Sequence, residues 1–382
     1  MDEHKFWKTQ PIQDTSQNEK INKSSDITEL NNNMFSIHPI NLPENFFWYE
    51  IDPKSEIDIN DLYNFLYDNY NYIDNKFGAH YTKESLHWYL SNPTYFQNMF
   101  LFVKYKEKVV GSIIGTPANI SIFDKLDIII DTSFLCISKK IREKSLASIM
   151  IKELLRRMYF NNVQFGYYTT HLLLPNILTC ATYYHRPINI KKLVNIDFIS
   201  KPSYMSMGTF EELYKTKDKL TLNLRKMNEN DISQCTQKLN QFYKKYKIYQ
   251  IYTEDEFKYK FLPQTNIIDS YVFEKDNNIQ AFISTFYTKS RIFNNKTYSE
   301  YNIAQIYHYF YYDDLIFIDM INDILLLMKQ QNIDVVNCLE QMDNHLFINK
   351  LNFKQGSGKL NFYFWNKKCP TFTNKDIALI TL

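Results

Sequence analysis

The sequence predicts an α+β protein made of two related halves, in which a mixed and mostly antiparallel sheet is flanked by helices. The chain has 382 residues, and domains usually span about 100–200 residues, so its length suits two domains or one large duplicated unit. Hydrophobic residues make up 45% of the sequence, which is enough for a sizeable core. The third observation is an order of elements that occurs twice at a nearly constant spacing.

The repeated order begins with a pair of strands. Residues 102–114 (FVKYKEKVVGSII) and 271–284 (YVFEKDNNIQAFIS) each place two apolar stretches around a charged turn, which predicts a β-hairpin. A further β-rich run follows each hairpin, at residues 127–138 and 303–312.

A helix and a strand complete each copy. Apolar residues then recur at helical spacing in both copies, as Leu146, Ile149, Met150 and Leu154 and as Ile318, Ile321, Leu325 and Met328. Strands predicted at 163–169 and 333–339 close the copies. The offset is 169 residues from position 102 to 271 and 170 from 163 to 333. An internal duplication with pseudo-twofold symmetry explains this constancy, although loose strand patterns can also produce it by chance.

This order of hairpin, strand, helix and strand resembles the unit of the GNAT-type acyltransferases, which use acyl-CoA donors. A helix that begins just after a central strand presents free N–H groups and the positive end of its dipole to an anion. In the first copy this junction carries four cationic side chains, Lys139, Lys140, Arg142 and Lys144. It is either a pyrophosphate site or a solvated basic turn. In the second copy Asp313 and Asp314 occupy the junction, where carboxylates would cap the helix and repel phosphate.

Charge and composition exclude several classes. Lys+Arg number 44 against 42 Asp+Glu, and no basic cluster with interleaved aromatics occurs, so we expect no nucleic-acid partner. No apolar run reaches the ~18–20 residues that span a bilayer. We therefore expect a cytoplasmic, monomeric protein without an integral membrane segment.

The five cysteines are far apart and form no metal-binding pattern. They are Cys136, Cys180, Cys235, Cys338 and Cys369. Because no CxxC pair or His at ligand spacing accompanies them, we interpret them as reduced structural thiols, with a nucleophile or a zinc ligand as the alternatives. No metal is expected.

The N-terminal arm comprises residues 1–40. Its first part, residues 4–11 (HKFWKTQP), carries the adjacent aromatics Phe6 and Trp7, which form either a strap over the core or a lid on a ligand. Residues 13–33 are polar and are predicted to be disordered. The two halves then follow as residues 41–205 and 206–382.

Four segments together resemble the glycylpeptide N-tetradecanoyltransferase, or N-myristoyltransferase, family. They are residues 4–11 (HKFWKTQP), 133–147 (SFLCISKKIREKSLA), 167–189 (YYTTHLLLPNILTCATYYHRPIN) and 353–370 (FKQGSGKLNFYFWNKKCP). The resemblance implies two fused GNAT-like halves, the first binding acyl-CoA and the second binding peptide. It also implies the direct transfer of myristate from myristoyl-CoA to the N-terminal glycine amine of a protein substrate.

The resemblance assigns residues to the acyl donor. It implies that the amides of Phe134 and Leu135 form an oxyanion hole, with both side chains in the core. The residues implied to bind myristoyl-CoA are His4, Lys5, Phe6, Trp7, Phe134, Leu135, Cys136, Ile137, Arg142, Glu143, Lys144, Ser145, Leu146 and Ala147. Among them Glu143 is unfavourable beside phosphate unless it points away or pairs with a cation.

The family's base is the chain's own terminal carboxylate, here on Leu382. Residues 377–382 (IALITL) are apolar to the end, which predicts a buried strand. An edge strand with a solvated terminus is the alternative.

The resemblance also assigns residues to the peptide substrate: Phe77, Tyr81, Tyr168, Thr169, His185, Phe198 and Ser357. His185 by itself could equally be structural. The family's acidic loop retains only Asp74 here, its late acidic turn has Ser357, and Ser133 replaces the usual Asn before Phe134. Fewer anions predict a weaker preference for basic residues downstream of the glycine.

Two rival functions remain open from the sequence. One is a related acyltransferase with another chain length or a lysine acceptor. The other is a relative that binds acyl-CoA or peptide without catalysis.

Overall fold

The computed structural model describes residues 6–13, 21, 23–31, 34–70, 76–142 and 145–380. Its α-helices are α1 (Glu56–Asn69), α2 (Lys83–Leu90), α3 (Leu146–Phe160), α4 (Ile190–Asn195), α5 (Met207–Glu212), α6 (Ile232–Tyr243), α7 (Glu254–Phe261), α8 (Asp314–Gln330) and α9 (His345–Ile348). Its strands are β1 (Ser25–Asp26), β2 (Phe46–Glu50), β3 (Phe77–His80), β4 (Phe100–Tyr105), β5 (Lys108–Ile122), β6 (Lys125–Ile137), β7 (Gly166–Thr170), β8 (Thr179–Pro187), β9 (Arg225–Lys226), β10 (Ile248–Gln250), β11 (Ile268–Lys275), β12 (Asn278–Ile292), β13 (Glu300–Tyr311), β14 (Val335–Leu339), β15 (Lys354–Trp365), β16 (Lys367–Lys368) and β17 (Ile377–Ala378).

One large sheet runs through the molecule. Its strand order is β17-β10-β5-β6-β7-β15-β8-β14-β13-β12-β11-β9, and β4 pairs with β5 beside this path. In the described part of the chain, β6–β7, β13–β14 and β10–β17 are parallel pairs, and the other named pairs are antiparallel. The predicted α+β class with a mixed, mostly antiparallel sheet is therefore confirmed.

The repeated order of elements is confirmed as well. The first copy consists of the hairpin β4–β5, strand β6, helix α3 and strand β7. The second consists of the hairpin β11–β12, strand β13, helix α8 and strand β14. In each copy the strand after the helix pairs in parallel with the strand before it, as a helical crossover requires.

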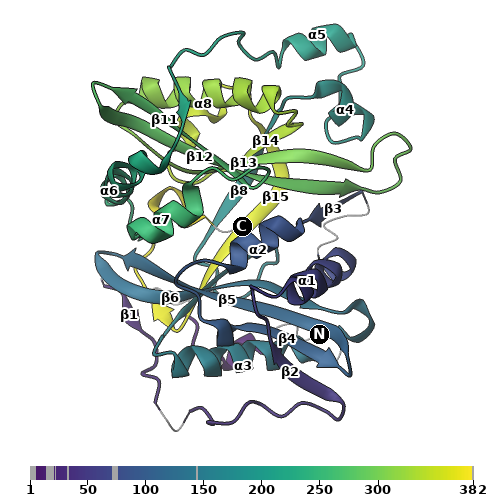
Figure 1. Cartoon of the computed structure of the whole chain (residues 1–382), viewed down its shortest axis with the longest axis vertical. Helices are drawn as coiled ribbons and strands as arrows, with labels where there is room; N and C mark the ends of the chain where they lie inside the picture. Colours follow the sequence, from purple (N-terminus) through teal and green to yellow (C-terminus); the bar gives the residue numbers. More distant parts are fainter. Residues whose placement is uncertain are drawn as a thin grey trace.

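The two copies exchange their next strands. Strand β8 follows β7 in the chain but pairs with β14 of the second copy, whereas β15 follows β14 but pairs with β7 of the first. The exchanged strands also pair with each other, so β7, β15, β8 and β14 lie side by side at the centre of the sheet. In Figure 1, β8 and β15 run between the two halves of the molecule. The halves therefore share one backbone hydrogen-bond network.

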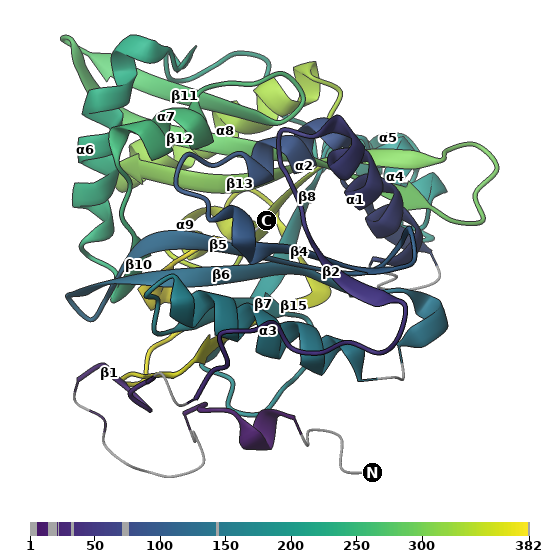
Figure 2. The ribbon, with the colours of Figure 1, turned by 60° about the horizontal axis from the view of Figure 1, so that its bottom comes forward.

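Helices cover the sheet on both sides. Helix α3 lies below the strands of the first copy and α8 lies beside those of the second, with α2 between the two copies (Figures 1 and 2). The periodicity explains α3, because Leu146, Met150 and Leu154 are all buried in one apolar cluster. Among the described residues, no helix is both long enough and apolar enough to cross a membrane.

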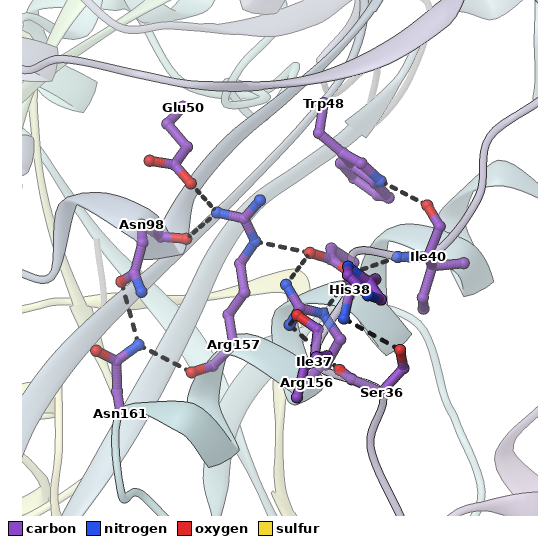
Figure 3. Close-up of polar contacts among 11 residues, drawn as sticks. Ser36, Ile37, His38, Ile40, Trp48, Glu50, Asn98, Arg156, Arg157 and Asn161 are labelled. Carbon is purple, nitrogen blue, oxygen red and sulfur yellow. Dashed lines mark hydrogen bonds and ion pairs between the residues drawn. The ribbon is translucent and has the colours of Figure 1, made fainter.

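Part of the N-terminal arm is tied to α3 by a buried ionic network (Figure 3). The Glu153 carboxylate accepts hydrogen bonds from Arg156 at 2.7 Å and from Arg157 at 2.8 Å. It also accepts a hydrogen bond from the backbone N–H of Ile40 at 3.0 Å, while Arg156 donates to the carbonyl of Ile37 at 3.2 Å. This network fixes where α3 lies against the chain that leads into β2.

The prediction of disorder for residues 13–33 is wrong for most of the part that the structure describes. Ser25 and Asp26 form β1, which pairs with β16. The backbone N–H of Thr28 donates to the Asn366 side chain at 2.9 Å, and Leu30 is buried. Polar composition predicted disorder here, but backbone pairing and one buried leucine hold the segment. The remainder of this prediction falls on residues 14–20, 22, 32 and 33, which lie outside the described residues.

Candidate active site

A cavity of about 1370 Å³ is lined by β6, β7 and α3 of the first half and by β12, β14 and β15 of the second. It brings together residues that the sequence assigned to the acyl donor and residues that it assigned to the peptide. Those that line it are Phe6, Trp7, Phe134, Leu135, Ala147, Phe77, Tyr81, Tyr168, Thr169, His185, Phe198 and Ser357.

The other predicted donor residues lie apart from this cavity or outside the described residues. Cys136, Ile137 and Leu146 are buried in the apolar cluster of the first half. Arg142 and Ser145 are exposed, just before α3. The predicted residues that lie outside the described ranges are His4, Lys5, Glu143, Lys144 and Leu382.

A β-bulge in β6 faces the cavity. Ser112 lies opposite Cys136 and Ile114 lies opposite Ser133, so two residues of β6, Phe134 and Leu135, share the place of one residue of β5. Phe134 has a φ of +50°, a left-handed conformation that is uncommon for a residue with a bulky side chain. A bulge of this kind takes residues out of the ladder, so their amides can point at another acceptor.

Buried contacts hold the bulge in place. The Ser112 hydroxyl donates to the Phe134 carbonyl at 2.8 Å. The Phe134 ring packs edge-on against Tyr81 and Tyr89, with 5.1 Å between ring centroids in each case. The expectation that both bulge side chains lie in the core is correct for Phe134 but wrong for Leu135, which is 37% exposed and lines the cavity. Its place in the bulge turns Leu135 outward.

The two crossover helices begin differently. Helix α3 starts after Ser145, which has a φ of 57° and makes no side-chain capping bond. The side chain of Arg142 instead donates to the carbonyls of Ile137, at 3.2 Å, and Asn69. Helix α8 is capped by Asp313, whose carboxylate accepts from Leu315 N–H at 2.8 Å, as the sequence predicted. Among the described residues, the N-cap side chain bonds to first-turn amides in α8 but not in α3.

The described end of the arm reaches the cavity. Trp7 stacks on Tyr168 with 5.2 Å between centroids and 15° between planes, and Phe6 packs edge-on against Trp7. The following residues are held in place, because the Asn366 N–H donates to the Pro11 carbonyl at 2.8 Å. The side chains of Phe6 and Trp7 thus form part of the cavity wall. Trp7 contacts Tyr168, which the sequence assigned to the peptide.

The predicted peptide residues from distant parts of the chain touch one another. Phe198 packs edge-on against Phe77 at 5.9 Å and against His185 at 5.3 Å. Nδ1 of His185 lies 2.7 Å from the Asn337 side-chain oxygen, and burial lowers the pKa of this histidine. The His185 ring is therefore neutral and donates a hydrogen bond from Nδ1 to the Asn337 oxygen. A Cβ on Gly356 would lie 2.3 Å from Nε2 of His185, so the close approach of β15 requires glycine there.

Most charged side chains at the cavity wall are cationic. Among the described residues, four lysines line it: Lys76, Lys289, Lys354 and Lys359. Asp197 is the one carboxylate among the described lining residues, and it lies 3.7 Å from Lys76. Lys289 pairs with Glu300 at 2.6 Å. Lys354 and Lys359 lie on either side of Ser357 in β15, where the pairing with β8 is irregular, and neither has an ion-pair partner among the described residues.

The described part of the C-terminal tail is buried, as predicted. Ile377 and Ala378 form β17 in parallel with β10, and both are fully buried. The side-chain amide of Gln341 donates to the carbonyls of Ile377 at 3.2 Å and Leu379 at 2.8 Å. Residues 381–382, including the predicted base Leu382, lie outside the described residues.

The cysteines are free thiols in this structure, which agrees with the structural interpretation. Cys136, Cys235, Cys338 and Cys369 are buried, and Cys180 is half-buried. Burial raises the pKa of Cys136 to about 12, so this thiol beside the bulge remains protonated and is a poor nucleophile.

Two supporting residues were missed from the sequence, namely Ser112 and Asn337. They hold the bulge and the His185 ring. Both lie in predicted apolar strands, and a polar side chain at a buried strand position needs a hydrogen-bond partner. This signal could have marked them, although it does not identify the partner.

Comparisons with known proteins agree with this arrangement. Residues 26–180 match the family described as myristoyl-CoA:protein N-myristoyltransferase, N-terminal domain, and residues 195–378 match its C-terminal domain. A glycylpeptide N-tetradecanoyltransferase of Plasmodium falciparum is 32% identical over 100% of this chain and 94% of its own. Glycylpeptide N-tetradecanoyltransferase 1 of Arabidopsis thaliana is 34% identical over 95% of this chain and 85% of its own.

A solved structure shows the same fold. Saccharomyces cerevisiae N-myristoyltransferase with bound myristoyl-CoA superposes with a TM-score of 0.94 at 29% identity, covering 100% of this chain and 95% of the yeast chain. Models of both domains and full-length relatives therefore match this chain. The chain belongs to the myristoyl-CoA:protein N-myristoyltransferase family and is an acyltransferase of the glycylpeptide N-tetradecanoyltransferase type.

Proposed function

We propose that this chain transfers myristate from myristoyl-CoA to the N-terminal glycine of protein substrates by direct attack of the glycine amine on the thioester carbon. The bulge at Phe134 is the observation that carries this proposal, because it faces a cavity lined by both sets of predicted ligand residues. The amides of Phe134 and Leu135 would stabilise the oxyanion. Losing one such donor typically costs about 2.7–4 kcal/mol of transition-state stabilisation.

The donor binds along the first half in this proposal. The uncapped start of α3 and the cations before it, Lys139, Lys140 and Arg142, favour a pyrophosphate. Trp7, stacked on Tyr168, closes the acyl site as a lid rather than serving only as a strap. Such a lid implies that myristoyl-CoA binds before the peptide.

In this proposal the acceptor binds where β3 and β8 pair with strands β12 and β14 of the second half. Tyr168 and Thr169 lie near the incoming amine, and Phe77, His185 and Phe198 form the groove beyond it. An α-amino group has a pKa of about 7.7–8.0, so it must lose a proton before it attacks. We propose that the terminal carboxylate of Leu382 takes this proton, with the buried tail at Ile377 and Ala378 directing it inward. The proposal includes a cytoplasmic monomer divided into halves near residue 205.

Mass spectrometry tests the reaction and the acceptor together. The chain is incubated with myristoyl-CoA and a peptide that begins with glycine and contains one internal lysine. A mass gain of one myristoyl group, located by fragmentation at the N-terminal amine, is expected. Acylation at the lysine, or a better rate with acetyl- or palmitoyl-CoA in competition, would support the related acyltransferase instead. Binding without any product would support the non-catalytic relative.

A further inference from the structure

A second, small cavity lies beside the first, between β6 and elements of the second half. Its volume is about 60 Å³, room for about two waters at ~30 Å³ each. Asp131 of β6 and Lys260 of α7 both line it, together with Tyr89, Thr116, Tyr307 and Ile380. This cavity thus places a carboxylate and an ammonium group on opposite halves of the molecule.

Four polar side chains at this cavity have no close partner among the described residues. Asp131 and Lys260 form no ion pair within 4.0 Å with any described residue, and Lys260 makes one long contact of 3.5 Å with Gln250. In the same part of the chain, the buried hydroxyls of Thr116 and Tyr307 have no hydrogen-bond partner. Because buried polar groups are almost always satisfied, water within the cavity is the natural bridge between the two charges.

A hydrogen bond joins the small cavity to the large one. The Tyr89 hydroxyl donates to the Ser133 hydroxyl at 2.9 Å. Tyr89 lines the small cavity, whereas Ser133 lines the large one immediately before the bulge residue Phe134. Ser133 and Asp131 are two residues apart on one strand and therefore share a face. A serine hydroxyl both donates and accepts. For a proton to leave the amine, Ser133 accepts it and donates its own proton to Tyr89, while Tyr89 donates to the cavity water, so the Tyr89–Ser133 hydrogen bond reverses during the transfer. The asparagine usual in this family cannot pass a proton on in this way.

We propose that Asp131 and Lys260, through the water of the small cavity and the Tyr89–Ser133 pair, form a proton relay for the acyl transfer. This inference rests on the proposed function. Two protons leave the glycine ammonium nitrogen as the amide forms: the one that the Leu382 carboxylate takes ends on the sulfur of the departing CoA, and the second must leave the site. In the relay the second proton forms an O–H bond on the Asp131 carboxylate and then passes to solvent, which restores the carboxylate. Lys260 is a positioning residue whose charge favours that carboxylate.

The electrostatics of both groups suit such a role. Burial raises the pKa of Asp131 to about 7 although the charge of Lys260 opposes this rise, and burial lowers the pKa of Lys260 to about 8. The other titratable groups that face the pair are Tyr89, Tyr167, Tyr252, Glu256, Tyr307 and His308. Burial raises the pKa of the tyrosines and lowers that of His308, so these groups stay neutral near pH 7. Glu256 is engaged by Thr253 at the start of α7.

The test is the pH dependence of kcat between pH 6 and 9 at saturating myristoyl-CoA and glycine peptide. In the wild type, kcat should rise with pH near pH 7, where Asp131 loses its proton; this rise is the limb of the pH profile. Asp131→Asn should lower kcat about tenfold at pH 8 and remove this limb, while the KM of the peptide stays unchanged. Lys260→Met should move that limb about one pH unit higher, because the lost cation no longer favours the carboxylate. Lys260→Arg should retain the wild-type profile.

Two further variants keep the result interpretable. Tyr89→Phe preserves the ring packing and both charges but breaks the hydroxyl link, so it should lower kcat as Asp131→Asn does, even if that variant folds poorly. Lys104→Met removes a buried lysine 3.5 Å from Asp61 that lines neither cavity, and should leave the limb in place. Wild-type profiles for Asp131→Asn and Tyr89→Phe would overturn the relay alone. A wild-type enzyme that forms no myristoylated peptide would overturn the proposed function itself.

Discussion

Replacing Ser112 by alanine tests whether the bulge at Phe134 carries the catalysis. The hydroxyl of Ser112 donates to the Phe134 carbonyl in a fully buried contact, and a hydrogen bond of this kind stabilises by about 0.5–1.5 kcal/mol. A residue held at a φ of +50° stores about 1–3 kcal/mol of backbone strain, which the surroundings must oppose. Without the hydroxyl, the bulge can relax and turn an amide away from the oxyanion.

The expected loss follows from these terms. Complete removal of one oxyanion donor lowers kcat by about 100- to 1000-fold, whereas partial relaxation of the bulge should cost about 1.4–2.7 kcal/mol, or a 10- to 100-fold fall in kcat. The rate of CoA thiol release at saturating substrates measures kcat, and calorimetric titration with myristoyl-CoA measures donor binding. Binding should stay within about twofold, because the alanine touches neither the acyl chain nor the phosphates.

Ser121→Ala provides the matched control, since Ser121 is another buried serine of β5 that lies outside the bulge. This variant should keep the wild-type kcat. If Ser112→Ala turned over within twofold of wild type while remaining folded, the argument that this hydrogen bond orients the oxyanion donors would be refuted.

Three other predictions concern the tail, the groove and stability. Deleting Leu382 should abolish turnover but leave myristoyl-CoA binding intact; retained turnover would exclude its carboxylate as the base. Glycine peptides with and without a lysine several residues downstream should react equally well, and an acidic residue there should be tolerated, because lysines dominate the described cavity wall; a large preference for lysine would contradict this. Glu153→Gln should lower the free energy of unfolding by about 3–5 kcal/mol in denaturant titrations at pH 7, since it leaves Arg156 and Arg157 without their buried carboxylate. Burial acts to raise the pKa of Glu153, but the hydrogen bonds from Arg156, Ile40 and Arg157 lower it overall, so its stabilisation is present above the unfolded pKa of about 4.3 and is lost as the pH falls through the lower folded value. The gap between variant and wild type should therefore close in acid.

The periodicity of apolar residues predicted those features of the fold that depend on a single segment of the chain. The two hairpins, the crossover strands, and the helices α3 and α8 all follow from the alternation of apolar residues and from helical spacing. Asp313 was identified as a helix cap because capping is local in sequence. These features made the duplicated fold readable without any knowledge of the tertiary contacts.

Contacts between distant segments were not predictable in the same way. Nothing in residues 167–189 indicates that β8 leaves its own half to pair with β14, because strand exchange is decided by the whole sheet. Residues 13–33 were predicted to be disordered because their composition is polar, yet pairing with β16 orders Ser25 and Asp26. Asp131 and Lys260 lie 129 residues apart, so only the fold reveals that they share a cavity.

The same exchange explains how a duplicated fold yields one asymmetric site. Each half offers a crossover helix at an equivalent place, but the two starts have opposite electrostatics. Asp313 satisfies the first amides of α8 and adds a negative charge, whereas α3 begins without a side-chain cap, beside Lys139 and Lys140. In the proposed function an anionic donor is thereby directed to the first half, while the exchanged strands β8 and β15 bring His185 and Ser357 to the same cavity. The strand exchange and the asymmetry at the two helix ends would together separate the donor from the acceptor.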